Sequence, residues 1–124
     1  MIYLILTSTD SRRYHQKNNT YDFTVELRDV LQGQFTCALL DFSCQSMSED
    51  LYVFSDICEP QYIHDSDLPL LRIITEPGEV TIPHFKRVSR QLIQRVRIYI
   101  RNGSFDVPTD DIGPIRVTLA LEPI

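Results

Sequence analysis

Two stretches near the end of the chain carry the clearest alternation of apolar and polar residues. In Leu92–Arg101, aliphatic residues at Val96, Ile98 and Ile100 alternate with arginines and a tyrosine. The stretch Gly113–Glu122 alternates in the same way from Ile115 to Leu121. A period of two is typical of a strand with one solvent-exposed face. We expect the two stretches to pair as antiparallel neighbours across the loop Asn102–Ile112.

Shorter apolar or alternating runs predict further strands along the rest of the chain. These are Ile2–Thr7, Asp22–Arg28, Phe35–Phe42, Leu51–Ile57, Leu70–Thr75 and Val80–Ile82, with Tyr62–His64 as a candidate edge strand. The run Phe35–Phe42 is almost continuously apolar, which suits a central strand but is also compatible with a short helix. Turn residues separate the runs, with Gly33 and Gly78 as sites for a positive φ angle.

The density of short strands, without a segment of clear helical period, predicts an all-β domain spanning residues 1–124. The expected architecture is a single jelly roll or a closely related antiparallel β-sandwich of about eight strands, with a small barrel as the other closed arrangement. The 124 residues are 43% hydrophobic and 23% charged, which is ordinary for a folded domain of this size.

Charge and cysteine content restrict the environment and the partners. The net charge of −5 makes direct nucleic-acid binding and attraction to an anionic membrane unfavourable. Three cysteines at irregular spacing, Cys37, Cys44 and Cys58, predict reduced thiols and a reducing intracellular compartment. The apolar start of the chain is short and lacks a basic segment, so we interpret it as a first strand rather than a signal peptide or a membrane span.

Candidate catalytic and metal-binding groups are sparse. The run His64–Asp67 contains catalytic residue types, but neighbours in one loop do not form a nucleophile, base and orienting group. Asp106, Asp110 and Asp111 lack the regular spacing of a calcium loop. The sequence therefore predicts a protein that is not an enzyme and needs no cofactor or metal. A basic cluster, Arg12, Arg13, His15 and Lys17, is interpreted as a solvated loop rather than a phosphate-binding arm.

An arginine-rich stripe is the candidate functional surface. If the two alternating stretches are neighbours, then their polar residues share the face opposite the core. The candidate subunit interface consists of Arg95, Arg97, Tyr99, Arg101 and Arg116. An ordinary solvated sheet face is the alternative reading of the stripe, and an acidic neighbouring subunit is the partner that an interface would take.

The order of several short blocks resembles small capsid-type proteins of Polinton (Maverick) elements and adintoviruses. The blocks are Ile2–Ser8, Asn18-Asn19 before Phe23–Leu27, Leu31 with Gly33–Phe42, Val53–Ile57, Pro69–Ile74 and Gly113–Leu119. The sequence differs from that group at Phe35, where tryptophan is usual, and at Ala120–Glu122, where an aromatic residue and an arginine are frequent.

The resemblance implies a structural protein of a virion, most specifically a minor capsid protein of the penton type. Its expected partners are further copies of itself, in a homo-oligomer such as a pentamer, and a major capsid protein. An attachment or adaptor module that binds a host or viral protein through Asn102–Ile112 is the alternative, and a small-barrel enzyme is a more distant one.

Overall fold

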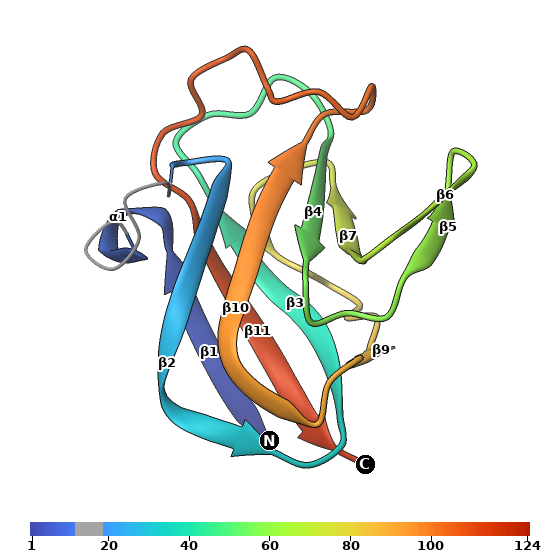
Figure 1. Cartoon of the computed structure of the whole chain (residues 1–124). Helices are drawn as coiled ribbons and strands as arrows, with labels where there is room; N and C mark the ends of the chain where they lie inside the picture. The colour runs from blue at the N-terminus through green and yellow to red at the C-terminus, as the bar shows by residue number, and fades with distance from the viewer. Residues whose placement is uncertain (12–18) are drawn as a thin grey trace.

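A computed structural model describes residues 1–11 and 19–124 and places them in an antiparallel β-sandwich (Figure 1). The first sheet has the order β1-β11-β3-β8, and a further strand, β9, also pairs with β3. Its strands are β1 (Ile2–Thr7), β11 (Arg116–Pro123), β3 (Phe35–Ser43), β8 (Gly78–Glu79) and β9 (Lys86–Arg87). The predicted all-β class and β-sandwich architecture are confirmed.

The second sheet lies over the first and has the order β2-β10-β4-β7. Its strands are β2 (Asp22–Gln32), β10 (Leu92–Arg101), β4 (Leu51–Ser55) and β7 (Leu70–Ile74). A separate hairpin of β5 (Gln61–Ile63) and β6 (Ser66–Leu68) projects beside this sheet, and a single helical turn, α1 (Ser8–Ser11), follows β1.

The core lies between the two sheets and is built from the inward-facing residues of each strand. Val96, Ile98 and Ile100 of β10 are fully buried, and so are Val117 and Leu119 of β11. Phe23 of β2 and Phe42 of β3 are the largest fully buried side chains of this core. The alternation that marks each strand in the sequence is thus the alternation between the core and the outer face.

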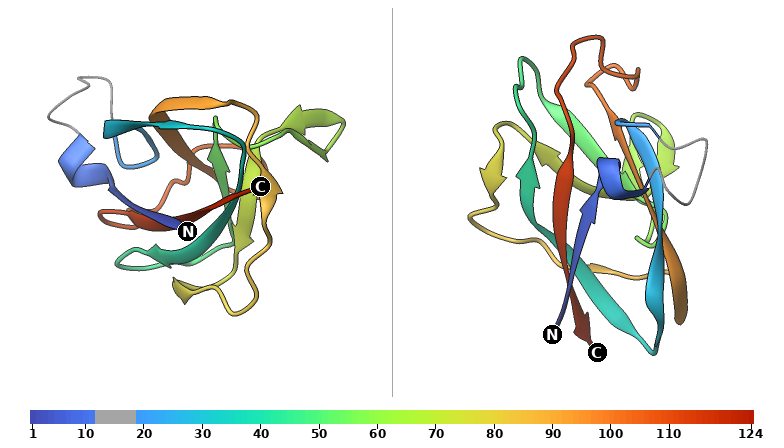
Figure 2. Two further views of the ribbon diagram at one scale, coloured as in Figure 1. Left: turned by 90° about the horizontal axis from the view of Figure 1, so that it is seen from below. Right: turned by 90° about the vertical axis from the view of Figure 1, so that its left-hand side faces the viewer.

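Most connections cross from one sheet to the other. The chain passes from β1 to β2, β3 and β4 by changing layer each time, and it does so again from β7 through β8 and β9 to β10 and β11. Both chain ends lie at the same end of the sandwich (Figure 2). The long loops 44–50 and 102–115 lie together at the opposite end, where Gln45 N–H donates to the Ile112 carbonyl at 2.8 Å.

The predicted pairing of the last two strands is wrong. β10 pairs with β2 and β4, whereas β11 pairs with β1 and β3 in the other sheet. Both strands bury an aliphatic row, and the two rows meet face to face across the core instead of lying side by side. The loop between them, residues 102–115, is long enough to cross from one layer to the other.

Several predicted boundaries also shift. β2 continues past the predicted end at Arg28 to Gln32, so residues 33–34 alone connect it to β3. The φ of Gly33, 129°, confirms the positive φ predicted from the sequence. Phe35–Phe42 is a strand and not a helix. The predicted strand Val80–Ile82 is wrong, because the strand that pairs with β3 is Gly78–Glu79; Val80 N–H adds one more hydrogen bond to the Leu40 carbonyl, at 2.8 Å. β4 ends at Ser55 and β11 begins only at Arg116, after Pro114.

Two further sequence features are a possible membrane span and the basic cluster near the start of the chain. No helix among the described residues is long and apolar enough to cross a membrane. The basic cluster Arg12, Arg13, His15 and Lys17 lies outside the described residues.

Candidate functional site

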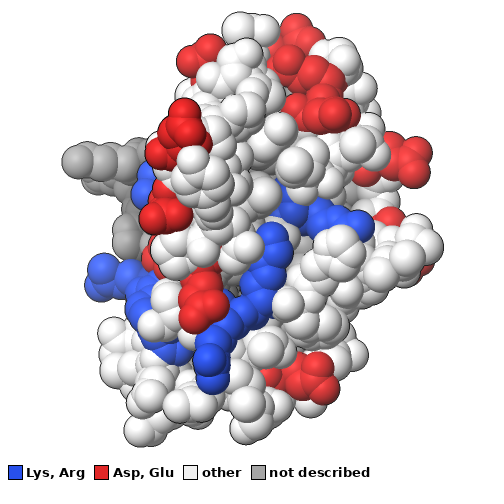
Figure 3. Space-filling view, turned by 90° about the vertical axis from the view of Figure 1, so that its right-hand side faces the viewer, with Lys and Arg blue, Asp and Glu red and all other residues white. Residues whose placement is uncertain are grey.

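Four of the five predicted interface residues share the outer face of β10. Arg95, Arg97, Tyr99 and Arg101 alternate with the buried aliphatic residues of that strand. They face the solvent between β2 on one side and β4 on the other, where Tyr99 lies opposite both Asp22 and Phe54. We call this set of four residues the arginine face. Figure 3 shows Lys and Arg side chains gathering in the lower and central part of one side of the molecule, with Asp and Glu side chains around them.

Arg116 does not belong to the arginine face. It lies at the start of β11, paired with Thr7 of β1 and Ser43 of β3 in the opposite sheet. The prediction that it shares a surface with Arg95, Arg97 and Arg101 is wrong, because it depended on β10 and β11 being neighbours.

Two of the arginines are paired with carboxylates of β2. Arg97 donates from Nε and Nη2 to the two carboxylate oxygens of Asp22, at 2.9 and 2.7 Å. This bidentate geometry is the strong form of an arginine ion pair, and it raises the pKa of Arg97 although partial burial opposes the shift. Arg95 Nε lies 2.8 Å from Glu26 Oε1 at a more exposed position. Two of the three positive charges of the arginine face are therefore balanced by carboxylates of the neighbouring strand β2.

Asp56 joins the arginine face to the segment that follows β4. Its carboxylate accepts the backbone N–H of Arg97 at 2.9 Å and Nη2 of Arg90 at 2.8 Å. Both bonds link segments more than thirty residues apart in the sequence. Arg97 and Arg90 thus stand at either side of one carboxylate, which fixes the position of β10 relative to the end of β4.

Tyr99 lies in the middle of the arginine face. The guanidinium carbons of Arg97 and Arg101 are 4.6 and 5.3 Å from the centre of its ring, within cation–π range. The ring also stacks on Phe54, with centroids 4.9 Å apart and planes 10° from parallel. Burial raises the pKa of the Tyr99 hydroxyl, and the two arginines partly oppose that shift.

An aromatic cluster covers the part of this outer face that lies over β4. Phe105, from the loop after β10, meets Tyr52, Phe54 and His64 edge-on, with centroids 5.6, 6.2 and 4.9 Å away. As a result Phe54 is only 1% exposed although it points away from the core between the sheets. The alternation along this strand puts Tyr52 and Phe54 on the face opposite Leu51 and Val53, but the cover over this face was not predicted from the sequence. The signal for the cover was Phe105, the one aromatic residue of the loop Asn102–Ile112.

The loop that carries Phe105 is held by Asn102. The Asn102 side-chain oxygen accepts the N–H groups of Ser104 and Asp106, both at 3.0 Å, and its carbonyl accepts the Phe105 N–H at 2.9 Å. Phe105 itself has a φ of 63°, which is unusual for a bulky residue. The local hydrogen bonds and the aromatic contacts together stabilise this conformation.

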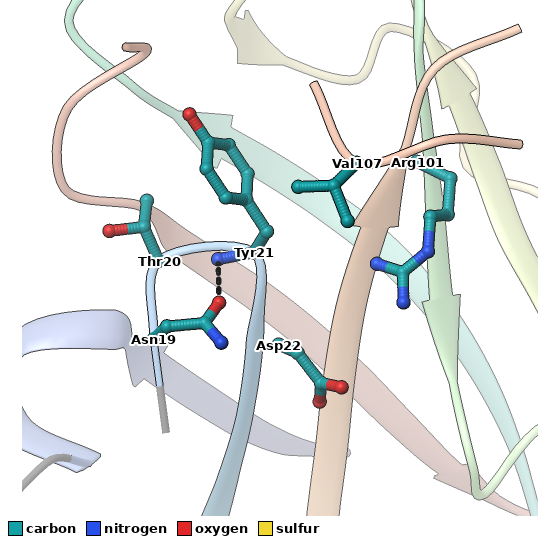
Figure 4. A pocket seen from close by; sticks show the side chains of 6 residues that line it. All are labelled: Asn19, Thr20, Tyr21, Asp22, Arg101 and Val107. Atoms are coloured by element: carbon teal, nitrogen blue, oxygen red, sulfur yellow. Dashed lines mark hydrogen bonds between the residues drawn. The ribbon is translucent and has the colours of Figure 1, made fainter. Parts of the chain in front are cut away.

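An open pocket of about 340 Å³ lies beside Arg101 (Figure 4). It is lined by Asn19, Thr20, Tyr21, Asp22, Arg101 and Val107. Tyr21 holds its wall in place, because its hydroxyl donates to the Asp110 carbonyl at 2.6 Å and its N–H donates to the Asn19 side chain at 2.9 Å. The lining combines a cation, a carboxylate and an exposed valine.

The constellations rejected as catalytic or metal sites have structural roles. His64 and Asp65 are the two-residue loop between β5 and β6, with φ values of 46° and 65°, as a type I′ turn requires. Asp110 accepts a hydrogen bond from the Ser48 hydroxyl, and Asp111 accepts the Gly113 N–H at 2.9 Å. Within residues 1–11 and 19–124, no group of three or more histidine, cysteine or acidic side chains could hold a metal ion.

All three cysteines carry free thiols. Cys37 and Cys58 are buried, and Cys44 is half-buried. The adjacent Cys58 side chain, followed by burial, strongly raises the pKa of Cys37. Burial also raises the pKa of Cys44. Both shifts keep the thiols protonated and poorly nucleophilic at neutral pH.

The arginine face, the two β2 carboxylates paired with it and the Phe54 ring stacked on Tyr99 together combine cationic, acidic and aromatic groups, a chemistry suited to contact with another protein surface. In comparisons with known proteins, no family model, curated protein or solved structure matches this chain.

Proposed function

We propose that this protein is a structural subunit of a virion, a minor capsid protein of the penton type that works by self-association. The observation that carries the proposal is the strand order. Two main sheets ordered β1-β11-β3-β8 and β2-β10-β4-β7, with the chain changing sheet at most connections, are what two nested Greek keys produce. That arrangement supports a single jelly roll, an architecture used by viral capsid proteins and also by lectin domains and cupins.

The resemblance of the sequence blocks to Polinton and adintovirus capsid-type proteins selects the capsid reading among these. The blocks coincide with strands that build the sandwich: Ile2–Ser8 covers β1, Gly33–Phe42 covers most of β3, and Pro69–Ile74 covers β7. This agreement is independent of the strand order, and it supports the proposal that the chain has the same fold as those capsid-type proteins.

Self-association through such a domain takes a defined physical form. Identical subunits that contact one another through two different surfaces close into a ring, and a ring of five fits a capsid vertex. The arginine face supplies one candidate surface. Because Arg95 and Arg97 already have carboxylate partners, we expect Arg101 and Tyr99 to contribute most to a neighbour, which would be a major capsid protein or the next copy.

The attachment or adaptor alternative is favoured by one observation. The pocket beside Arg101 is open, and Val107 on its rim is 48% exposed in the loop that this alternative assigns to partner binding. A partner that inserts a small apolar group beside Arg101 would account for both features.

The mass of the purified chain in solution, measured by light scattering after gel filtration, tests the proposal. A mass five times that of the 14.4 kDa chain supports the penton-type subunit. Arg101→Glu should then reduce the pentamer, whereas Arg95→Glu, at a paired and exposed position, should change it less. A monomer that also fails to join a candidate major capsid protein would contradict the proposal and favour the adaptor alternative.

A further inference from the structure

The strand β1 forms an edge of the first sheet. Among residues 1–11 and 19–124, the one strand that pairs with it is β11. The register is continuous, from Ile2 opposite Leu121 to Thr7 opposite Arg116. The right-hand view of Figure 2 shows β1 beside β11, with β2 in the other layer. An edge strand offers main-chain N–H and C=O groups to any extended chain that approaches it.

β1 lacks the features that usually protect an edge. Its six residues include no charge, no proline and no bulge. The edge strands of the rest of the sandwich differ in this respect. β2 carries Asp22, Glu26, Arg28 and Asp29, β7 follows Pro69 and contains a bulged pairing, and β8 and β9 have two residues each. Short length, charge, proline and bulges are the devices that block edge pairing.

The outward side chains of β1 are apolar and exposed. Tyr3 is 61% and Ile5 is 66% exposed. Their neighbours on β11 are the buried Ala120 and the half-buried Thr118, so no charged side chain lies opposite them on that strand. A strand without charge can meet a second copy of itself without like-charge repulsion, which would oppose the same pairing of β2.

The hydrogen-bond pattern decides which main-chain groups of β1 face outward from the sheet. Ser8 N–H donates to the carbonyl of its opposite residue, Ile115, at 2.9 Å. In an antiparallel ladder every second pair is bonded, so Ile2, Leu4 and Leu6 also bond to β11. The N–H and C=O groups of Tyr3 and Ile5 therefore point to the free edge.

We propose that two copies of this protein pair through β1, antiparallel and about a two-fold axis, with Leu4 opposite Leu4 of the partner subunit. In this register Tyr3 of each copy lies opposite Ile5 of the other, and the two residues exchange both main-chain hydrogen bonds. Aromatic and β-branched residues form favourable cross-strand pairs. The alternative centred on Ile5 would bring Tyr3 opposite Thr7, directly beside α1, where the chain leaves the strand direction.

This inference does not depend on the proposed ring. Pairing uses up the free edge of β1, so each copy takes one partner there, and a subunit that forms no ring stops at two copies. The two proposals can therefore fail separately: a pentamer can form without pairing through β1, and a dimer paired through β1 can form without a pentamer.

The test is a sedimentation and light-scattering series over protein concentration with charge variants on the exposed face of β1. Ile5→Lys should raise the dissociation constant of the pairing about tenfold or more, because two cross-strand pairs are lost. Ile73→Lys on the edge strand β7 makes the same change at another exposed position and should leave the mass unchanged. Circular dichroism checks that each variant folds.

A mixture of two variants then tests the register. Tyr3→Glu should also abolish pairing alone, but Tyr3→Glu mixed with Ile5→Lys places the glutamate opposite the lysine and should restore a mixed pair, detected by native mass spectrometry. The proposal is overturned if the wild type never pairs, if Ile5→Lys pairs as the wild type does, or if association continues into heterogeneous aggregates. Rescue by Ile5→Glu with Ile5→Lys, in place of the first mixture, would overturn the stated register.

Discussion

Replacing Phe54 by alanine tests whether the outer face of β4 is covered by aromatic side chains. Phe54 points outward, yet it is 1% exposed because Tyr99 stacks on it and Phe105 meets it edge-on at 6.2 Å. A buried Phe→Ala change costs about 3–5 kcal/mol. We expect the lower end of that range, about 3 kcal/mol, because Phe105 lies on a loop and can partly fill the space.

The matched control is Ile73→Ala on the neighbouring strand. Ile73 lies on the same outer face, opposite Tyr52, but is 43% exposed. Its loss should cost about 1 kcal/mol or less, as for surface positions generally. Both free energies of unfolding can be measured by urea denaturation, followed by circular dichroism and tyrosine fluorescence, since the chain contains no tryptophan.

Equal and small effects at the two positions would refute the reasoning. They would mean that the loop carrying Phe105 does not rest on the sheet in solution and that the face over β4 is simply solvated. A large effect for Phe54 with a small one for Ile73 would establish that this loop is part of the folded unit. The arginine face would then have a rigid border.

Three further predictions concern the loops, the ion pairs and the thiols. Gly113→Ala should lower the free energy of unfolding, measured by urea denaturation, by about 1–2 kcal/mol, because Gly113 has a φ of 75° and an added Cβ would lie 2.6 Å from the Gln45 side chain. Gly103→Ala is the control and should be nearly neutral, because a Cβ added there would have no atom within 4 Å. Arg97→Met should lower the free energy of unfolding by about 1 kcal/mol, because Arg97 makes the bidentate ion pair with Asp22. Arg95→Met should lower it by less than about 0.5 kcal/mol, because the pair of Arg95 with Glu26 is a more exposed single contact. Equal effects of the two changes would contradict this reasoning. Alkylation of the native protein should modify Cys44 before the two buried cysteines. Its rate should still be rising with pH beyond 9.0, where an unshifted thiol levels off, because burial raises the Cys44 pKa. Modification of Cys37 first, read by mass spectrometry, would contradict the burial.

The sequence by itself determined the long strands and which of their faces is buried, but not the short strands β6, β8 and β9. The alternation of Val96, Ile98 and Ile100 with the residues between them correctly separated core from surface, because the side-chain period of a strand is a local property of the backbone. For the same reason Arg95, Arg97, Tyr99 and Arg101 were correctly predicted to share one face. These four residues follow from a spacing of two and need no knowledge of the neighbouring strands.

Only the tertiary structure decided which strands are neighbours and which outward residues are covered. β10 and β11 have the same alternating pattern, so the pattern could not tell a side-by-side pair from two rows facing each other across the core, and Arg116 was misplaced for that reason. Asp22 reaches Arg97 across 75 residues of sequence, and Phe105 buries Phe54 from a loop. Such contacts depend on how whole layers pack, because a local period specifies a face but carries no information about what lies against it.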